Sequence, residues 1–75
     1  MYTIVIYHPG KGEKSYKHID KITYVDILSE NIVLSGSDIL KHKFPVDRIL
    51  HFHAGSTCHI INPAIIGSIS IHEES

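Results

Sequence analysis

Apolar and polar residues alternate with the period of β-strands along most of this chain, and the alternation is densest between residues 44 and 61. The dipeptide Gly55-Ser56 in this stretch suits a two-residue type II′ turn, because glycine accepts the positive φ that the first central position requires. We therefore predict a hairpin with one register: Ala54 opposite Thr57, His53 opposite Cys58, Phe52 opposite His59, His51 opposite Ile60, and Leu50 opposite Ile61.

This register divides the hairpin into two faces, since successive strand side chains point to opposite sides. The expected core face carries Leu50, Phe52 and Ile61, together with His59. The other face carries His51, His53, Cys58 and Ile60. The second face is the one place where residues able to do chemistry converge.

Other segments show the same strand pattern, and glycine, proline and other turn residues separate them. Residues 13–19 are polar and rich in lysine, which is typical of an edge strand that buries only Tyr16 and Ile19. The further expected strands are residues 2–7, 22–28, 32–35 and 68–72, with Ile69 and Ile71 inward in the last, and a turn or bend is expected at 8–12, 35–38 and 62–67.

Two connections are less regular. The hairpin of residues 22–35 has either a three-residue loop with Asn31 in the left-handed conformation or a two-residue loop at Glu30-Asn31, and the two differ by one residue of register. No window of ten residues supports an amphipathic helix, so we expect residues 39–44 to be extended, with Leu40 and Phe44 inward. Pro45 cannot donate to a strand ladder, which predicts one 3₁₀ turn at residues 45–48.

The turn signals recur every eight to twelve residues, which is the spacing of small all-β folds. We predict one all-β domain over residues 1–75, an antiparallel meander of about six to eight short strands. It would form either a barrel or two packed sheets.

Composition narrows the functional classes. The chain has 75 residues, a net charge of −1, seven histidines and one cysteine. A domain of this size buries only roughly two-thirds of its unfolded surface, and one cysteine excludes an internal disulfide, so we expect a homo-oligomer or a bound metal to stabilise it. The lone thiol and the lack of a hydrophobic leader predict a cytoplasmic protein, and no apolar run is long enough to predict a membrane span. The near-neutral charge gives no global basic footprint for nucleic acid.

His51, His53 and Cys58 together are candidate ligands for zinc or copper. They lack the paired CxxC spacing of a secure zinc motif. Catalysis is not expected, because Cys58 and His59 point to opposite faces and no orienting acid is evident for Cys58 with His53. We predict that the protein is not an enzyme.

A nucleic-acid or nucleotide site is an alternative, based on the lysine-rich edge. Tyr7, Tyr16 and Tyr24 could provide surfaces for base stacking, while acidic residues interleave with the basic ones. The candidate phosphate contacts are Lys11, Lys14, Lys17 and Lys21.

Two resemblances add to these expectations. Ile22-x-Tyr24 with Asn31-Ile-Val33, and later His59-Ile-Ile-Asn62 with Ile65, resemble pieces of LytTR-type β DNA-binding domains over less than a third of the chain. The short all-β frame that starts directly on a strand is similar to small orphan all-β proteins of phages and prophages in Gram-positive bacteria. That resemblance implies a phage accessory protein or host-defence inhibitor.

Together these observations predict a non-enzymatic β-domain that acts by protein binding or ligand sequestration and that self-associates. Its partners would be further copies of itself and a host or cellular protein. The candidate interaction residues are His51, His53 and Cys58, with Tyr7 and Tyr24 as aromatic anchors.

Overall fold

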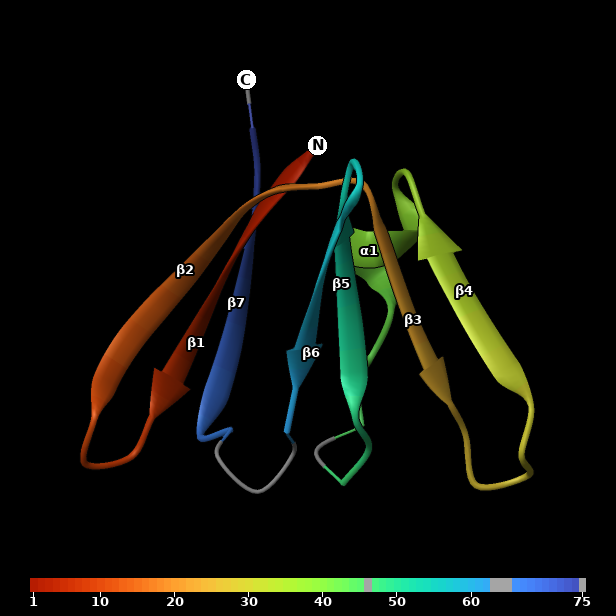
Figure 1. The fold of residues 1–75 in the computed structure, drawn as a ribbon, viewed down its shortest axis with the longest axis horizontal. Helices are drawn as coiled ribbons and strands as arrows, with labels where there is room; N and C mark the ends of the chain where they lie inside the picture. Colours follow the sequence, from red (N-terminus) through yellow and green to blue (C-terminus); the bar gives the residue numbers. More distant parts are fainter. Residues whose placement is uncertain (46, 63–65, 75) are drawn as a thin grey trace.

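A computed structural model describes residues 1–45, 47–62 and 66–74. The described residues form seven strands and one helical turn: β1 (Tyr2–His8), β2 (Gly12–Ile19), β3 (Lys21–Val25), β4 (Asn31–Ser35), α1 (Asp38–Lys41), β5 (Leu50–Ala54), β6 (Thr57–Ile61) and β7 (Ser68–Glu73). All pairings are antiparallel. A three-stranded sheet has the order β2-β1-β7, and a four-stranded sheet has the order β4-β3-β5-β6 (Figure 1).

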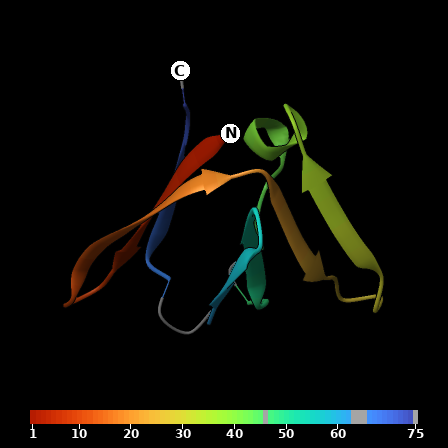
Figure 2. The ribbon, with the colours of Figure 1, turned by 45° about the horizontal axis from the view of Figure 1, so that its top comes forward.

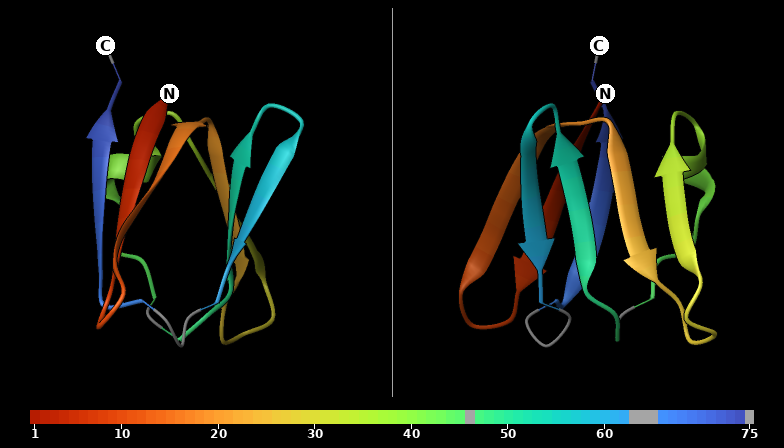
Figure 3. Two further views of the ribbon diagram at one scale, coloured as in Figure 1. Left: turned by 60° about the vertical axis from the view of Figure 1, so that its left-hand side comes forward. Right: turned by 45° about the vertical axis from the view of Figure 1, so that its right-hand side comes forward.

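The two sheets face each other across the core, as the left view of Figure 3 shows. Each sheet contributes alternate residues of its strands, because strand side chains point to opposite faces. The buried side chains are Tyr2, Ile4, Ile6, Tyr16, Ile19, Ile22, Tyr24, Leu34, Ile39, Leu50, Phe52 and Ile61. The predicted all-β fold is confirmed in its two-sheet form.

The chain passes directly from β2 into β3 and thereby changes sheets, so the two sheets diverge from this crossing (Figure 2). Asp20 lies between the strands, and its N–H donates to the carbonyl of His53 at 2.9 Å. The two chain ends meet at the same end of the molecule, where the N–H of Glu74 donates to the carbonyl of Met1 at 2.9 Å (Figure 1). The carboxylate of Glu74 also accepts from the Thr3 hydroxyl and the His18 N–H.

The hairpin of β5 and β6 has the predicted register at all five residue pairs. Gly55 has a φ of +61°, and Ser56 is not among the residues of positive φ, as a type II′ turn requires. β2 is an edge strand that buries Tyr16 and Ile19, as its lysine-rich pattern predicted.

The three-residue loop predicted for the second hairpin is correct in length but wrong in position, and the two-residue alternative is wrong. Val25 pairs with Asn31 and the N–H of Asp26 donates to the carbonyl of Glu30 at 3.0 Å, so the loop consists of residues 27–29 and its left-handed residue is Ser29. Asp26 explains this position, because its Oδ1 accepts from the N–H groups of Leu28 and Glu30, both at 2.9 Å. An aspartate side chain that satisfies two loop amides favours a turn that starts at that residue.

The predicted extended segment at residues 39–44 is also wrong in part, because its first residues form α1. In this helical turn Ile39 is fully buried and Leu40 is 46% exposed, the reverse of an inward Leu40. Phe44 packs against the core as predicted. The expected 3₁₀ turn at 45–48 includes residue 46, outside the described residues, while Asp47 and Arg48 form a bend; the bend expected at 62–67 falls largely on 63–65, also outside them.

The last strand agrees with its pattern. In β7, Ile69 and Ile71 pack against the core from the edge of the three-stranded sheet. The described residues include no helix that is long and apolar enough to cross a membrane.

Candidate functional site: the outer face of the four-stranded sheet

One row of side chains crosses all four strands of the larger sheet on the side away from the core. Thr23 pairs with Val33 on one side and with His51 on the other, and His51 pairs with Ile60. The row therefore runs from β4 through β3 and β5 to β6. We call this surface, made of Lys21, Thr23, Val25, Asn31, Val33, Ser35, Ile49, His51, His53, Cys58 and Ile60, the outer face.

The outer face is unusually apolar for a solvent-exposed surface. Val33 is 60% exposed and Ile60 is 67% exposed, at the two ends of the row. Val25 and Ile49 are also about half exposed and line a shallow hollow with His51. A second hollow of about 360 Å³ lies between Thr23 and Val33. Contiguous exposed apolar surface of this kind marks interaction sites.

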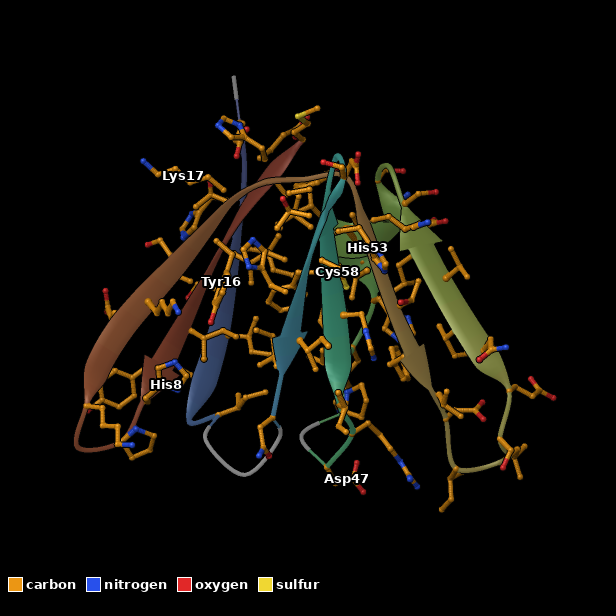
Figure 4. The ribbon with its side chains drawn as sticks, viewed as in Figure 1. His8, Tyr16, Lys17, Asp47, His53 and Cys58 are labelled. Atoms are coloured by element: carbon orange, nitrogen blue, oxygen red, sulfur yellow. The ribbon has the colours of Figure 1, made fainter. Side chains whose placement is uncertain are left out.

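The histidines and the cysteine of the hairpin lie on this face, but their contacts differ from the predicted ones. Cys58 is opposite His53 in register, yet its Sγ lies 3.7 Å from Nδ1 of His51, the diagonal neighbour. Nε2 of His53 instead shares a hydrogen bond of 2.9 Å with the hydroxyl of Thr23. The two imidazole rings are nearly parallel, with centroids 6.5 Å apart. Figure 4 shows His53 and Cys58 close together on β5 and β6.

The zinc prediction gains no support from this arrangement. Over the described residues no group of three or more His, Cys, Asp or Glu side chains has the geometry of a metal site. His53 is engaged with Thr23, which leaves His51 and Cys58 as a pair, and a structural zinc ion takes four ligands. The metal site stays a prediction.

His53 has the one shifted histidine pKa among the residues that the structure describes. Partial burial lowers this pKa from its ordinary value of 6.5, and the positive charges of Lys21 and of protonated His51 lower it further, while Asp20 acts in the opposite direction. The environment of the outer face therefore favours the neutral form of His53 more than full exposure to water would.

This shift predicts a stability that depends on pH. Below about 6.5 the unfolded chain protonates His53 while the folded chain still resists it, so the unfolded state binds more protons and stability falls as the pH falls. We expect the melting temperature to decline from pH 6.5 downward, and the decline to be smaller in His53→Gln. Equal slopes in the two proteins would contradict this role. The pKa of Glu74 is lowered from 4.5, chiefly by the hydrogen bond from the His18 N–H. Its contribution to stability is therefore lost only at a pH below about 4.5, which separates it from the effect of His53.

The two tyrosines predicted as anchors do not lie on the outer face. Tyr24 is 8% exposed and points into the core side, because it alternates with Thr23; its hydroxyl hydrogen-bonds to Nε2 of His42 at 2.5 Å. Tyr7 is 45% exposed, but it belongs to β1 in the other sheet. The structure therefore brings together His51, His53 and Cys58 and separates both tyrosines from them.

The four candidate lysines do not form one track. Lys14 pairs with the inward Ile6 and lies over the ring of Tyr16, which is itself buried and offers no free stacking surface. Lys17 points away from the molecule (Figure 4). Lys11 lies in the β1–β2 turn, and Lys21 is on the other sheet beside His53. This placement does not favour a nucleic-acid groove.

Sequence reasoning missed the aliphatic half of the site: Val25, Val33 and Ile49. For Ile49 a signal exists, because no Lys, Arg, Asp or Glu occurs between Arg48 and Glu73. This uncharged segment includes β5, β6 and most of β7. Val25 and Val33 could not have been assigned to a face without the register of the second hairpin.

Comparison with known proteins finds no family model, curated protein or solved structure that matches this chain.

Proposed function

We propose that this domain is a non-enzymatic protein-binding module and that the outer face is its binding surface. The observation that carries the proposal is the row of Val33, Thr23, His51 and Ile60 across four adjacent strands, with an exposed aliphatic side chain at each end. Interfaces are depleted of charge at the centre and polar at the rim. The outer face has this arrangement, because the row itself carries no Lys, Arg, Asp or Glu and Lys21, Asp26 and Arg48 lie around it.

The shape of the surface favours a protein over a small ligand. Small-molecule sites are concave and bury most of their ligand. The two hollows of the outer face are shallow depressions on a sheet, lined by side chains of several strands. The expected partner is therefore a folded protein or a segment with an apolar patch bordered by charges of both signs. We propose a cellular protein of a host as this partner, as the resemblance to small phage and prophage proteins implies.

Two lysines placed in the row should weaken partner binding strongly. In Val33→Lys/Ile60→Lys, both substituted side chains are exposed in the wild type, so the fold should be kept, while a partner would have to desolvate two charges. We expect a partner retained by the wild-type protein to lose about tenfold or more in affinity, since 1.4 kcal/mol corresponds to a factor of ten. The measurement is quantitative affinity enrichment from source-cell extract, followed by titration of the enriched protein.

The matched control is Ser15→Lys/Ser70→Lys. Both serines are exposed and flank Val5 on the outer side of the three-stranded sheet, so the control adds the same charge to the opposite surface. It should keep the partner. If the two double variants retained the same proteins with the same affinity, the outer face would not be the binding surface.

A further inference from the structure

β6 is the last strand of the four-stranded sheet, and one of its edges has no neighbour among the described strands (Figure 3, right). A two-residue hairpin loop closes on a hydrogen-bonded pair, and hydrogen-bonded pairs then alternate along the ladder. In β6 the residues bonded to β5 are therefore Thr57, His59 and Ile61. The N–H and C=O groups of Cys58 and Ile60 point away from β5, toward the open edge.

These four edge groups have no partner in the described part of the chain. Among residues 1–45, 47–62 and 66–74, no backbone hydrogen bond outside the ladder involves Cys58 or Ile60. Both side chains are exposed on the outer face. An edge with free donors and acceptors is a template for another strand unless charge, proline or a covering element blocks it.

The other edge strands carry or adjoin charged residues, which disfavour the pairing of a further strand, whereas β6 does not. β2 carries Glu13, Lys14 and Lys17, and β7 ends in Glu73. β4 has no charge of its own but lies between Glu30 and Asp38, so pairing of two β4 strands about Val33 would bring these carboxylates near one another. β6 lies far from any charged residue in sequence, because none occurs between Arg48 and Glu73.

We propose that a second copy of this chain pairs with β6 in antiparallel fashion, about a two-fold axis at His59. In this register Cys58 of each copy lies opposite Ile60 of the other, and Thr57 lies opposite Ile61. Cys58 and Ile60 are the residues whose edge groups are free, so each of these two pairs exchanges two hydrogen bonds and all four groups of each copy are satisfied. The strand is thus self-complementary, and the product is a continuous sheet with the order β4-β3-β5-β6-β6-β5-β3-β4.

This inference deepens the proposed function and rests on it in one respect: the dimer joins two outer faces into one larger binding surface. Pairing places Cys58 and Ile60 of both copies side by side on that surface. Extension of a sheet by an edge strand is a general mode of protein recognition, with the main chain supplying hydrogen bonds. The edge supplies the self-association, and the aliphatic row stays available to a further partner.

The first test uses the single cysteine, so it needs no variant. In the proposed register the two Cys58 residues are offset by two positions along the paired strands, at about 3.4 Å each. With a strand spacing of about 4.8 Å, their Cα atoms lie about 8 Å apart. A direct disulfide needs Cα atoms within about 6.8 Å, whereas a bismaleimide with a spacer of about 8 Å bridges them. We expect cross-linked dimer with that reagent and none by oxidation in the native state. No cross-link at concentrations where sedimentation shows a dimer would overturn the register.

The second test compares Cys58→Pro with Cys58→Ser in analytical ultracentrifugation. Proline removes an N–H that β5 does not use, so the hairpin should still fold, whereas the dimer loses two of its four hydrogen bonds. We expect the dimer dissociation constant to rise about tenfold or more in Cys58→Pro and to stay near the wild-type value in Cys58→Ser. Circular dichroism checks the fold of both, and Ile60→Pro repeats the test if Cys58→Pro does not fold.

A wild-type chain that stays monomeric, or a dimer that survives the proline variants, overturns edge pairing. Val33→Lys separates this failure from failure of the proposed function, because Val33 lies on β4, away from the paired edge. A dimer broken by Val33→Lys but not by Cys58→Pro would mean association through the outer face itself. Loss of edge pairing with an intact, Val33-dependent partner interaction would leave the proposed function standing.

Discussion

Replacing Phe52 by alanine is expected to remove a large part of the free energy of unfolding of this protein. Phe52 is 1% exposed at the centre of β5, and its ring meets that of Tyr16 edge to face, with centroids 5.6 Å apart and planes at 75°. The contact joins the two sheets. Phe→Ala in a core costs about 3–5 kcal/mol, and a domain of this size has a total stability of about 4–11 kcal/mol. The melting temperature should fall by about 15 °C or more.

Two controls make this expectation specific to the core position. Phe52→Leu keeps most of the buried volume and should cost about 1 kcal/mol. Val33→Ala removes exposed apolar atoms and should stay within about 0.5 kcal/mol of the wild type. Thermal and denaturant unfolding followed by circular dichroism measure all three. A Phe52→Ala variant as stable as Val33→Ala would show that the two sheets do not depend on the contact between Phe52 and Tyr16.

Replacing Gly67 by alanine should be the second most damaging single change of this kind. A Cβ at Gly67 would lie 2.9 Å from the carbonyl oxygen of Tyr7 and 2.9 Å from the ring carbons of Pro9. The same Tyr7 oxygen accepts the N–H of Gly67 at 2.8 Å, so the backbone cannot move away without losing that bond. We expect a loss of about 2 kcal/mol, since overpacking typically costs 1–3 kcal/mol.

The effect of Gly67→Ala should be concentrated where β7 joins β1. Hydrogen exchange should show faster exchange for the amides of β7 and for the part of β1 beside it, while the hairpin of β5 and β6 keeps its protection. Ser68→Ala is the control, because it changes the adjacent residue and adds no atom. If Gly67→Ala and Ser68→Ala had the same melting temperature, the close approach of Gly67 to the Tyr7 carbonyl would not affect the free energy of unfolding.

The outer face links these stability arguments to function. Phe52 and His51 are neighbours on one strand, so the side chain that holds the sheets together also sets the position of the row on the opposite side. A binding defect in the outer-face variants is therefore interpretable only when their melting temperatures match that of the wild type. The pH dependence expected from His53 gives an independent check that the outer face is intact.

Local sequence determined the parts of this protein that a few neighbouring residues decide. Gly55-Ser56 sets the turn, and the turn with the alternation around it sets the register and the faces of the β5–β6 hairpin. The lysines of β2 likewise indicated an edge strand, and the two isoleucines of β7 indicated its inward side. These features depend on backbone preferences and side-chain period, which act over a few residues.

The tertiary structure alone decided the rest. The pairing of β3 with β5 and of β1 with β7 joins segments far apart in the chain, and no local pattern distinguishes such partners. Ile39 is buried in place of Leu40 because a helical turn, not a strand, meets the core there. The aliphatic row exists only because β3 lies between β4 and β5, which aligns Val33, Thr23, His51 and Ile60. The proposed binding surface is thus a product of non-local strand pairing, and the sequence alone could locate only its histidine and cysteine side.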